Sequence, residues 1–593
     1  MARLPQLTTV IAVALSLSSC SIVSSPGSDG TFELLIIHNN DMHARFEQTS
    51  QLSGACTTAD RDAGKCYGGF PRVATVVKEA RKAAASGQGP PVLYLNAGDT
   101  YTGTAWFTIY KWKIAAEFLN ALEPDAVSLG NHEFDHGVSG LTPFIENLTS
   151  PVLAANLVLT KVPELEDQTN LRKSIVFNIS ETHIGVIGYL TPETKTLAVQ
   201  NDVEYIDEIV ALKKEVKRLK KEGVNIIIAL GHSGYLKDLQ IAKEVEGLNL
   251  VIGGHTNTFL WNGTSPDSEK IIGPYPTYVT QPSGKQVPVV QAYAYTKYLG
   301  KLHMVFNTNG DLIKADGNPV LLDNSIPQDP EVLSIIDKYR EKVLNFTEEI
   351  IGNTTVVLDG LVTCQHKECN LGNLIADAMV YKYSSEYTGK EWTDAPIAII
   401  QGGGIRSSIS MAQKSAIVTK GDLITALPFE GVLVVVTMNG SILMQMLEHS
   451  VANLNDIYYP GEFLQVSGLK IVYDLKKPDN HKVVKAVARC WNCTVPKYTD
   501  VDVRESYNVI MPYFVANGGD GYWMLKGLPT RVLDYNELSS TITYFRKYSP
   551  VHPEIEGRIT FLQKNKLCSL SNNLVSSTLL ILVLIACNYI INL

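Results

Sequence analysis

The chain lacks low-complexity tracts and repeats of a fixed period, and it has no excess of basic residues. The missing repeats exclude a solenoid or another repeat array. With a formal net charge of −9, the charge balance gives no indication of a nucleic-acid-binding protein. The composition, 45% hydrophobic and 19% charged, is typical of a globular protein. Because 593 residues are too many for one hydrophobic core, we expect at least two domains.

Cysteine is scarce: there are nine, of which Cys20 and Cys587 lie in the terminal segments and Cys568 lies beside one. The other six form three close pairs that we predict to be local disulfides of a secreted chain: Cys56/Cys66, Cys364/Cys369 and Cys490/Cys493. Zinc binding by the third pair is an alternative, although a second CxxC or CxxH motif is missing. Sequons that fit a glycosylated exterior occur at Asn147, Asn178, Asn262, Asn345, Asn353, Asn439 and Asn492.

Both termini resemble processing signals. Residues 7–17 are apolar, follow Arg3 and lead into small residues, which predicts a signal peptide over residues 1–25. The sequence before Cys20 also resembles a bacterial lipoprotein box, an alternative. Residues 574–593 are apolar and uncharged, which predicts a GPI-anchor signal over residues 567–593 with attachment at Ser569 or Ser571. The alternative is a transmembrane helix. We expect a protein on the extracellular face of the plasma membrane, anchored or also secreted.

Five strand-like apolar runs in the first half each end in Asp, Asn or His. Carboxyl ends of strands are where α/β sheets build their sites. The polar stretches that follow these runs are Asp41-Met42-His43, Gly98-Asp99, Gly130-Asn131-His132-Glu133, Gly231-His232 and Gly253-Gly254-His255-Thr256-Asn257.

The second half is separated from the first by a predicted bridging helix. We expect an α/β domain over residues 30–325, a bridge over 326–348 that begins with Asp329 as N-cap, and a second α/β domain over 349–566. The Lys-rich run over 213–221 is predicted to be the solvated face of a helix.

The polar strand ends provide carboxylate, imidazole and amide ligands. Two hard divalent ions that share a carboxylate need such a mixed set, and it suits Zn²⁺ or Mn²⁺ better than Ca²⁺. The predicted metal ligands are Asp41, His43, Asp99, Asn131, His232 and His255.

The order of these motifs resembles that of the calcineurin-like metallophosphoesterases. In the second half, Asn370-Leu371-Gly372-Asn373, Gly402-Gly403-Gly404-Ile405-Arg406 and Ala516-Asn517-Gly518-Gly519-Asp520-Gly521 resemble the 5′-nucleotidase family, and the tail resembles its GPI-anchored animal members. The resemblance covers nearly the whole mature chain. It implies an N-terminal four-layer αββα sandwich and a C-terminal α/β nucleotide-binding domain, with a homodimer as the expected assembly.

The resemblance also assigns roles at the metal centre. Asp41, His43 and Asp99 would hold the first ion, with Asp99 bridging to the second. Asn131, His232 and His255 would complete the second ion's ligands. His132 and Asp135 would form the catalytic dyad, in which the carboxylate orients the imidazole toward the phosphoryl group. Asn257 lies where some members have a further ligand of the first ion, and we group it with the substrate-binding candidates.

The same resemblance predicts a nucleoside site in the second domain. Phe429 and Phe514 would sandwich the base, Asp520 would accept hydrogen bonds from the ribose, and Arg406 and Gln401 would contact the substrate. Arg45 would add a phosphate or ribose contact, with a solvated surface arginine as the alternative.

Three positions depart from the animal ecto-enzymes. Gln365 replaces an arginine just after the first cysteine of the short disulfide loop, and Gln401 replaces an asparagine. Ala376 stands where a further disulfide would be.

The expected activity is extracellular hydrolysis of nucleoside 5′-monophosphates, chiefly AMP, by in-line attack of a water activated by two metal ions. Because Gln365 departs from the animal ecto-enzymes, an apyrase that cleaves ATP and ADP is an alternative. A broader nucleotide or UDP-sugar hydrolase and a non-catalytic surface-binding glycoprotein are further alternatives.

Overall fold

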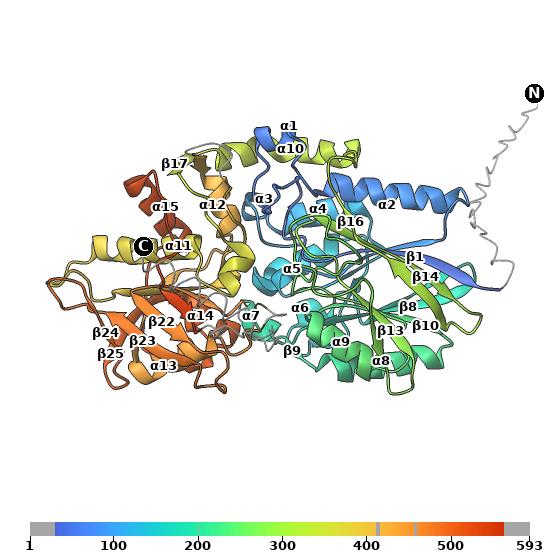
Figure 1. The fold of residues 1–593 in the computed structure, drawn as a ribbon. Coiled ribbons are helices and arrows are strands. Elements are labelled where there is room, and N and C mark those ends of the chain that lie inside the picture. The colour runs from blue at the N-terminus through green and yellow to red at the C-terminus, as the bar shows by residue number, and fades with distance from the viewer. Residues whose placement is uncertain (1–29, 200, 411–415, 456–458, 460, 563–593) are drawn as a thin grey trace, which may run out of the picture.

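A computed structural model describes residues 30–199, 201–410, 416–455, 459 and 461–562. The predicted signal peptide and GPI signal lie outside these residues. The described chain forms two α/β lobes, blue to green and yellow to red in Figure 1, joined by helix α10 (Pro330–Thr347). In the described ranges, no helix combines the length and apolar character that a membrane span requires.

The first lobe contains an eight-stranded sheet in which strands β1 to β4 are parallel neighbours. Alternate side chains of β1 face opposite sides: Leu35 and Ile37 pack toward helices α2 and α4, whereas Leu34 and Ile36 pack toward the second sheet. The elements are β15 (Leu312–Gly317), β14 (Tyr298–Phe306), β1 (Phe32–Asn39), β2 (Val92–Asn96), β3 (Ala126–Ser128), β4 (Val152–Leu153), β6 (Leu171–Arg172), β16 (Val320–Leu321), α2 (Phe70–Ala85), α4 (Trp112–Leu122) and α5 (Gly137–Asn147).

A second, six-stranded sheet stacks on the first, and helices α8 and α9 cover its outer face. All seven residues of its central strand β10 are buried, as expected for a parallel strand covered on both faces. This lobe therefore has the predicted order helix, sheet, sheet, helix. The elements are β12 (Thr277–Thr280), β13 (Gln286–Val290), β11 (Leu250–Ile252), β10 (Ile226–His232), β8 (Thr182–Leu190), β7 (Ser174–Ile179), α8 (Glu208–Lys221) and α9 (Tyr235–Glu244).

The predicted bridging helix is confirmed as α10. The Asp329 carboxylate accepts hydrogen bonds from the backbone N–H groups of Glu331 and Val332, both at 3.1 Å. Val332, Ile336 and Val343 bury one face of α10 in the core that contains α2 and α4. The helix also contacts α12 (Lys420–Ala426) of the second lobe, so it packs against both lobes.

The second lobe is built on a five-stranded mixed sheet with a core on each face. Helices α11 and α15 cover one face, and helix α13 with a four-stranded sheet covers the other. The elements are β21 (Leu464–Ser467), β18 (Ile397–Gln401), β25 (Ser506–Pro512), β20 (Leu433–Asn439), β26 (Thr530–Val532), β24 (Tyr498–Asp500), β23 (Val483–Arg489), β22 (Leu469–Tyr473), β27 (Ile559–Phe561), the pair β17 (Ile350–Thr354) and β19 (Ala416–Thr419), α11 (Asn370–Glu386), α13 (Gly440–His449) and α15 (Glu537–Tyr548).

Candidate active site

The five predicted strand ends meet where the two sheets of the first lobe come together. Asp41 and Asp99 follow the parallel neighbours β1 and β2, whereas His232 is the last residue of β10 in the other sheet. The His232 ring lies with Nδ1 2.7 Å from the Ala97 carbonyl oxygen, so it joins the second sheet to the loop after β2. The site is therefore carried by two rigid sheets.

The loops that carry these residues have a strained backbone. Five site residues that are not glycine have a positive φ between 47° and 78°: Asp41, His43, Asp99, His255 and Asn257. For such residues the left-handed conformation costs about 1–2 kcal/mol each. A cluster of strained residues in one place is typical of a functional site, because packing must maintain the strain.

Asp99 is the common member of two groups whose ligand atoms lie within 4.8 Å of one another: His43, Asp99 and His132, and Asp99, His232 and His255. Its Oδ2 lies 2.9 Å from His232 Nε2, without the alignment of a hydrogen bond, and 3.8 Å from His43 Nε2. Asp41 Oδ1 is buried and has no hydrogen-bond partner. Such converging, unsatisfied oxygen and nitrogen atoms fit divalent cations, with Asp99 between the two sites.

The other predicted ligands lie in the same cluster. The backbone N–H of His255 donates to Asp41 Oδ2 at 2.9 Å, and His255 Nδ1 lies 2.9 Å from Asn131 Oδ1. The structure therefore brings the predicted carboxylate, imidazole and amide groups into one place.

Burial and mutual attraction set the charges of this cluster. Burial opposes the charged form of His232, but Asp99 and Asp41 outweigh it and raise the pKa of His232 to about 10. At His255, burial and the nearby His232 outweigh the attraction of Asp99 and lower the pKa to about 3. Burial raises the pKa of Asp41 to about 6. These opposite shifts indicate a cluster of buried carboxylates that needs positive charge.

His132 and Asp135 form the predicted pair. His132 Nδ1 lies 2.9 Å from Asp135 Oδ2, which leaves Nε2 on the side of Asp99, 4.0 Å from Asp99 Oδ2. Burial opposes the imidazolium, but Asp135 outweighs it and raises the pKa of His132. The carboxylate thus holds the ring in one orientation and favours its charged form.

Glu133 has a role that we did not predict. Its buried carboxylate accepts hydrogen bonds from the backbone N–H groups of Gly130, Asp99, Thr100 and Tyr101, at 2.7 to 3.2 Å. It therefore ties the loop after β2 to the loop after β3. The only signal in the sequence was its position beside Asn131 and His132.

The second lobe reaches into this cluster. Arg406 Nη2 lies 2.7 Å from His43 Nε2, and the Phe429 ring stacks on His132 with 5.6 Å between centroids. Next to Phe429, Glu430 accepts hydrogen bonds from Lys111 Nζ of the first lobe at 2.7 and 2.8 Å. A molecule in this site would contact both lobes.

The remaining substrate-binding candidates are spread around this contact. Phe514 packs against Gly519, where a Cβ atom would come within 2.6 Å of the ring. The predicted sandwich of a base between Phe429 and Phe514 stays a prediction. Burial raises the pKa of Asp520 to about 7. Gln401 Oε1 and Asn257 Oδ1 are buried without a hydrogen-bond partner.

Arg45 is fully buried, so the alternative of a solvated surface arginine is wrong. Its Nη1 donates to the carbonyl oxygens of His43 and Gly103, both at 2.9 Å. Its Nη2 donates to the carbonyl oxygen of Arg406 at 3.3 Å, and its guanidinium lies over the Tyr295 ring. These contacts support the loop that carries His43 and connect it to the second lobe.

All three predicted disulfides are present, and two of them lie apart from the metal cluster. Cys66 is buried and is bonded to Cys56, which closes the loop that carries the short helix α1 (Thr58–Asp62). This bond confirms the predicted pairing of Cys56 with Cys66. The bond between Cys490 and Cys493 replaces the zinc-site alternative.

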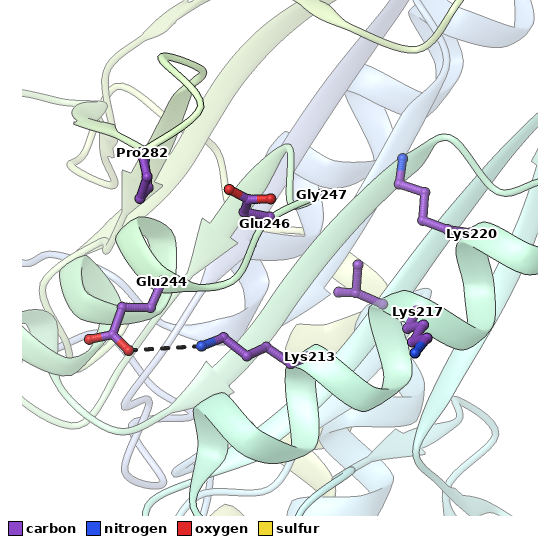
Figure 2. Close-up of a pocket in the computed structure, with 8 residues that line it drawn as sticks. Lys213, Lys217, Lys220, Glu244, Glu246, Gly247 and Pro282 are labelled. Atoms are coloured by element: carbon purple, nitrogen blue, oxygen red, sulfur yellow. Dashed lines mark ion pairs between the residues drawn. The ribbon is translucent and has the colours of Figure 1, made fainter.

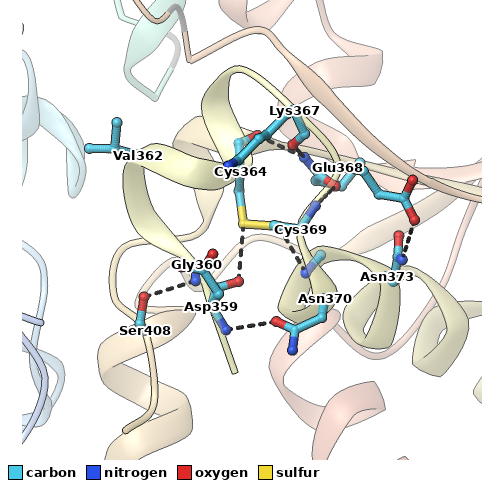
Figure 3. Close-up of a disulfide and its surroundings, with 12 residues drawn as sticks. Asp359, Gly360, Val362, Cys364, Lys367, Glu368, Cys369, Asn370, Asn373 and Ser408 are labelled. Atoms are coloured by element: carbon cyan, nitrogen blue, oxygen red, sulfur yellow. Dashed lines mark hydrogen bonds between the residues drawn. A yellow bond between two sulfur atoms is a disulfide. The ribbon is translucent and has the colours of Figure 1, made fainter. Parts of the chain in front are cut away.

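The disulfide between Cys364 and Cys369 lies beside the predicted nucleoside site. Figure 3 shows the bond between Cys364 and Cys369 at the start of α11. This loop packs on the glycine-rich run: a Cβ atom on Gly402 would lie 2.3 Å from the Cys364 carbonyl oxygen and 3.0 Å from the Cα of Gln365. Gln365 therefore lies next to the residues predicted to contact the nucleoside.

The fold and the site define a metallophosphoesterase: stacked sheets with carboxylates and histidines converging at their edge. Residues 34–259 match the calcineurin-like phosphoesterase family, and residues 350–527 match the 5′-nucleotidase C-terminal domain. Matching relatives include Protein 5NUC of Lutzomyia longipalpis, 46% identical over 91% of this chain and 94% of that one, and human 5′-nucleotidase, 42% identical over 90% and 91%.

Among solved structures, the 5′-nucleotidase precursor of Thermus thermophilus is 31% identical and superposes with a TM-score of 0.80. That match covers 90% of this chain and all of the bacterial one. The chain belongs to the 5′-nucleotidase family and is a hydrolase with a metallophosphoesterase domain.

Proposed function

We propose that the protein hydrolyses nucleoside 5′-monophosphates, chiefly AMP, to nucleoside and phosphate. The observation that carries this proposal is the meeting of Arg406 with His43 across the two lobes. A phosphate beside the buried cluster would be within reach of Arg406, and its nucleoside would lie against the loops of Phe429 and Gly402. The snake venom enzyme of Naja atra, 42% identical over 90% of this chain, is named 5′-nucleotidase.

The residues of the site would have different roles in the reaction. Asp41, His43, Asp99, Asn131, His232 and His255 would hold two divalent ions, which we propose to be Zn²⁺. Bound there, the ions would neutralise the phosphate dianion and lower the pKa of a water. His132, oriented by Asp135, would stabilise charge on the transferring phosphoryl group. The residue-level roles and the domain limits 30–325, 326–348 and 349–566 remain part of this proposal.

We also propose secretion, GPI anchoring and a homodimer. The first two rest on the terminal sequence patterns, and the homodimer rests on the family resemblance. A glycosylated exterior is supported by six sequon asparagines that are exposed: Asn147, Asn178, Asn262, Asn345, Asn439 and Asn492.

Phosphate release from AMP, ADP and ATP, offered separately to the purified protein with and without a chelator, tests the activity. We expect release from AMP alone, lost with the chelator and restored by Zn²⁺. Release from ATP and ADP with accumulation of AMP would instead establish an apyrase, and Gln365→Arg would be the first variant to test. Absence of release from every nucleotide would favour a binding protein.

The role of His132 is tested by His132→Ala, with His183→Ala as a matched control because His183 is exposed on β8. We expect the first variant to lower kcat by roughly 10²- to 10⁴-fold with an unchanged melting temperature. The control should keep full activity. Unchanged turnover in the His132 variant would contradict its proposed role.

A further inference from the structure

The outer face of α8 carries six cationic side chains on one continuous, solvent-exposed arc. Its opposite face buries Leu212, Val216 and Leu219 against the second sheet. The prediction of a solvated face is therefore confirmed, but the cations are concentrated in a chain whose net charge is −9. They are Lys213, Lys214, Lys217, Arg218, Lys220 and Lys221.

The surface is hollowed on one side of α8 by a cavity of about 610 Å³. Lys213, Lys217 and Lys220 line it from the helix, and Glu244 and Glu246 line it as well. Figure 2 shows Lys213 directed toward Glu244. Within the part of the chain that the structure describes, Lys213 is the only one of these lysines with an ion pair. The pair is long, with Nζ 4.0 Å from Glu244 Oε2.

A second cavity of about 550 Å³ lies along the other row of cations. Lys214 and Arg218 line it from α8. Arg172 lines it from β6, and Lys173 lines it from the position between β6 and β7. Glu215 is the only carboxylate among the described residues of this lining, and it forms an ion pair with Arg218. The helix is thus a cationic ridge between two hollows, which together are lined by seven cations and three carboxylates.

Several of these cations are not neutralised by the protein. Among the described residues, no carboxylate oxygen lies within ion-pair distance of Lys214, Lys217 or Lys221. Lys285 lies near Lys220: burial and the Lys220 ammonium lower the pKa of Lys285, and Asp311 partly offsets this shift. Crowded, unpaired cations raise the local concentration of anions.

We propose that α8 and its two flanking hollows bind a linear sulfated polysaccharide. Such a chain presents regularly spaced anions that can follow a ridge and enter hollows on its sides. Among the described residues that line the hollows, none is an aromatic side chain on which the bases of a single-stranded nucleic acid would stack. Insertion into a bilayer needs a free apolar helix face, and that face of α8 is buried in the protein's own core.

Binding of the full-length protein to immobilised heparin at 50 and 200 mM NaCl tests the proposal. We expect binding that weakens at least roughly tenfold over this range, because three or four ion contacts release counterions. The variant Lys214→Glu/Lys217→Glu/Lys221→Glu should lose this binding. Lys→Gln at the same positions should weaken it without adding acidic groups near the helix C-terminus.

The matched control is Lys476→Glu/Lys477→Glu/Lys485→Glu, which makes the same charge change on exposed residues of the second lobe. It should bind heparin like the unmodified protein. Both triple variants should retain the hydrolase activity of the unmodified protein, so this test is independent of the substrate. Equal heparin binding by all variants, or binding to phosphatidylserine vesicles without binding to heparin, would overturn the proposal.

Discussion

At the scale of single residues, Glu133 shows how one buried carboxylate organises two active-site loops. It ties the backbone of the loop that carries Asp99 to that of the loop that carries Asn131 and His132. Burial raises its pKa to about 7, and the bonded N–H groups of Gly130 and Asp99 partly offset this shift. The geometry of the predicted metal ligands therefore depends on a residue that is not itself among them.

We expect Glu133→Gln to destabilise the protein by about 1–3 kcal/mol and to weaken Zn²⁺ binding. The amide nitrogen cannot accept hydrogen bonds, so buried backbone donors would lose their partner. Thermal unfolding and titration of the metal-free protein with Zn²⁺ would measure the two effects. Glu166→Gln, on an exposed side chain, is the control and should change neither. Metal affinity unchanged in the Glu133 variant would show that the loops hold their geometry without it.

At the scale of elements, strand ends and helix starts place the functional groups through close backbone contacts. The glycine-rich run after β18 meets the loop of the Cys364–Cys369 disulfide at Gly402, where there is no space for a side chain. Helix α15 begins with a buried acid, Glu537, whose Oε2 has no hydrogen-bond partner. The packing at Gly402 and the burial of Glu537 can each be tested by a single substitution.

Gly402→Ala should destabilise the second lobe by about 1–3 kcal/mol and raise the KM for the nucleotide. Its Cβ would lie 2.3 Å from the Cys364 carbonyl oxygen, a backbone atom that can yield only if the loop moves. Gly89→Ala is the control, because its Cβ would have ordinary contacts of 3.5 Å or more. The melting temperature and the KM should be measured for both variants. If the two variants have equal values, the packing of Gly402 against the Cys364 carbonyl oxygen is not as close as the structure shows.

Glu537 should make the stability depend on pH. Burial raises its folded-state pKa from 4.5 to about 7, so its carboxyl stays protonated in the folded protein while it ionises in the unfolded chain. The stabilisation that this group gives to the folded protein is fully present below pH 4.5. As the pH rises to 7, the free energy of unfolding falls by about 3 kcal/mol at most.

Glu537→Gln removes this loss. Melting temperatures of both proteins at pH 5, 6, 7 and 8 should show the variant gaining relative to the unmodified protein as the pH rises. A constant difference across this range would refute the shifted pKa.

At the scale of the whole molecule, the site is shared by two lobes that meet over a short contact. The ion pair of Lys111 and Glu430 closes the lobes beside His132 and Phe429. Because α10 packs against both lobes, we predict that a hinge between the lobes lies close to this helix.

Lys111→Glu and Glu430→Lys should each raise the KM for AMP about two- to fivefold, because an exposed ion pair contributes about 0–1 kcal/mol. Lys111→Glu/Glu430→Lys, which restores opposite charges, should recover most of the loss. A double-mutant cycle on KM and kcat measures this coupling. Additive effects of the two single variants would mean that the pair does not act across the lobes.

The sequence by itself determined the strands that carry the site, the helix between the lobes and the candidate metal ligands. Apolar runs that end in Asp, Asn or His predicted β1, β2, β3, β10 and β11, and a capping Asp329 before Pro330 predicted α10, because these signals are local in the chain. Close cysteine pairs, such as Cys56 and Cys66, predicted the disulfides for the same reason.

Only the tertiary structure decided which distant groups meet. The inward turn of Arg45, the four backbone donors on Glu133 and the approach of Arg406 to His43 each join segments far apart in the sequence or depend on the strained loops that bring them together. The hollows beside α8 likewise require strands from elsewhere in the lobe. The hydrophobic pattern along a helix or strand indicates which of its faces is buried, but long-range packing determines what that face contacts.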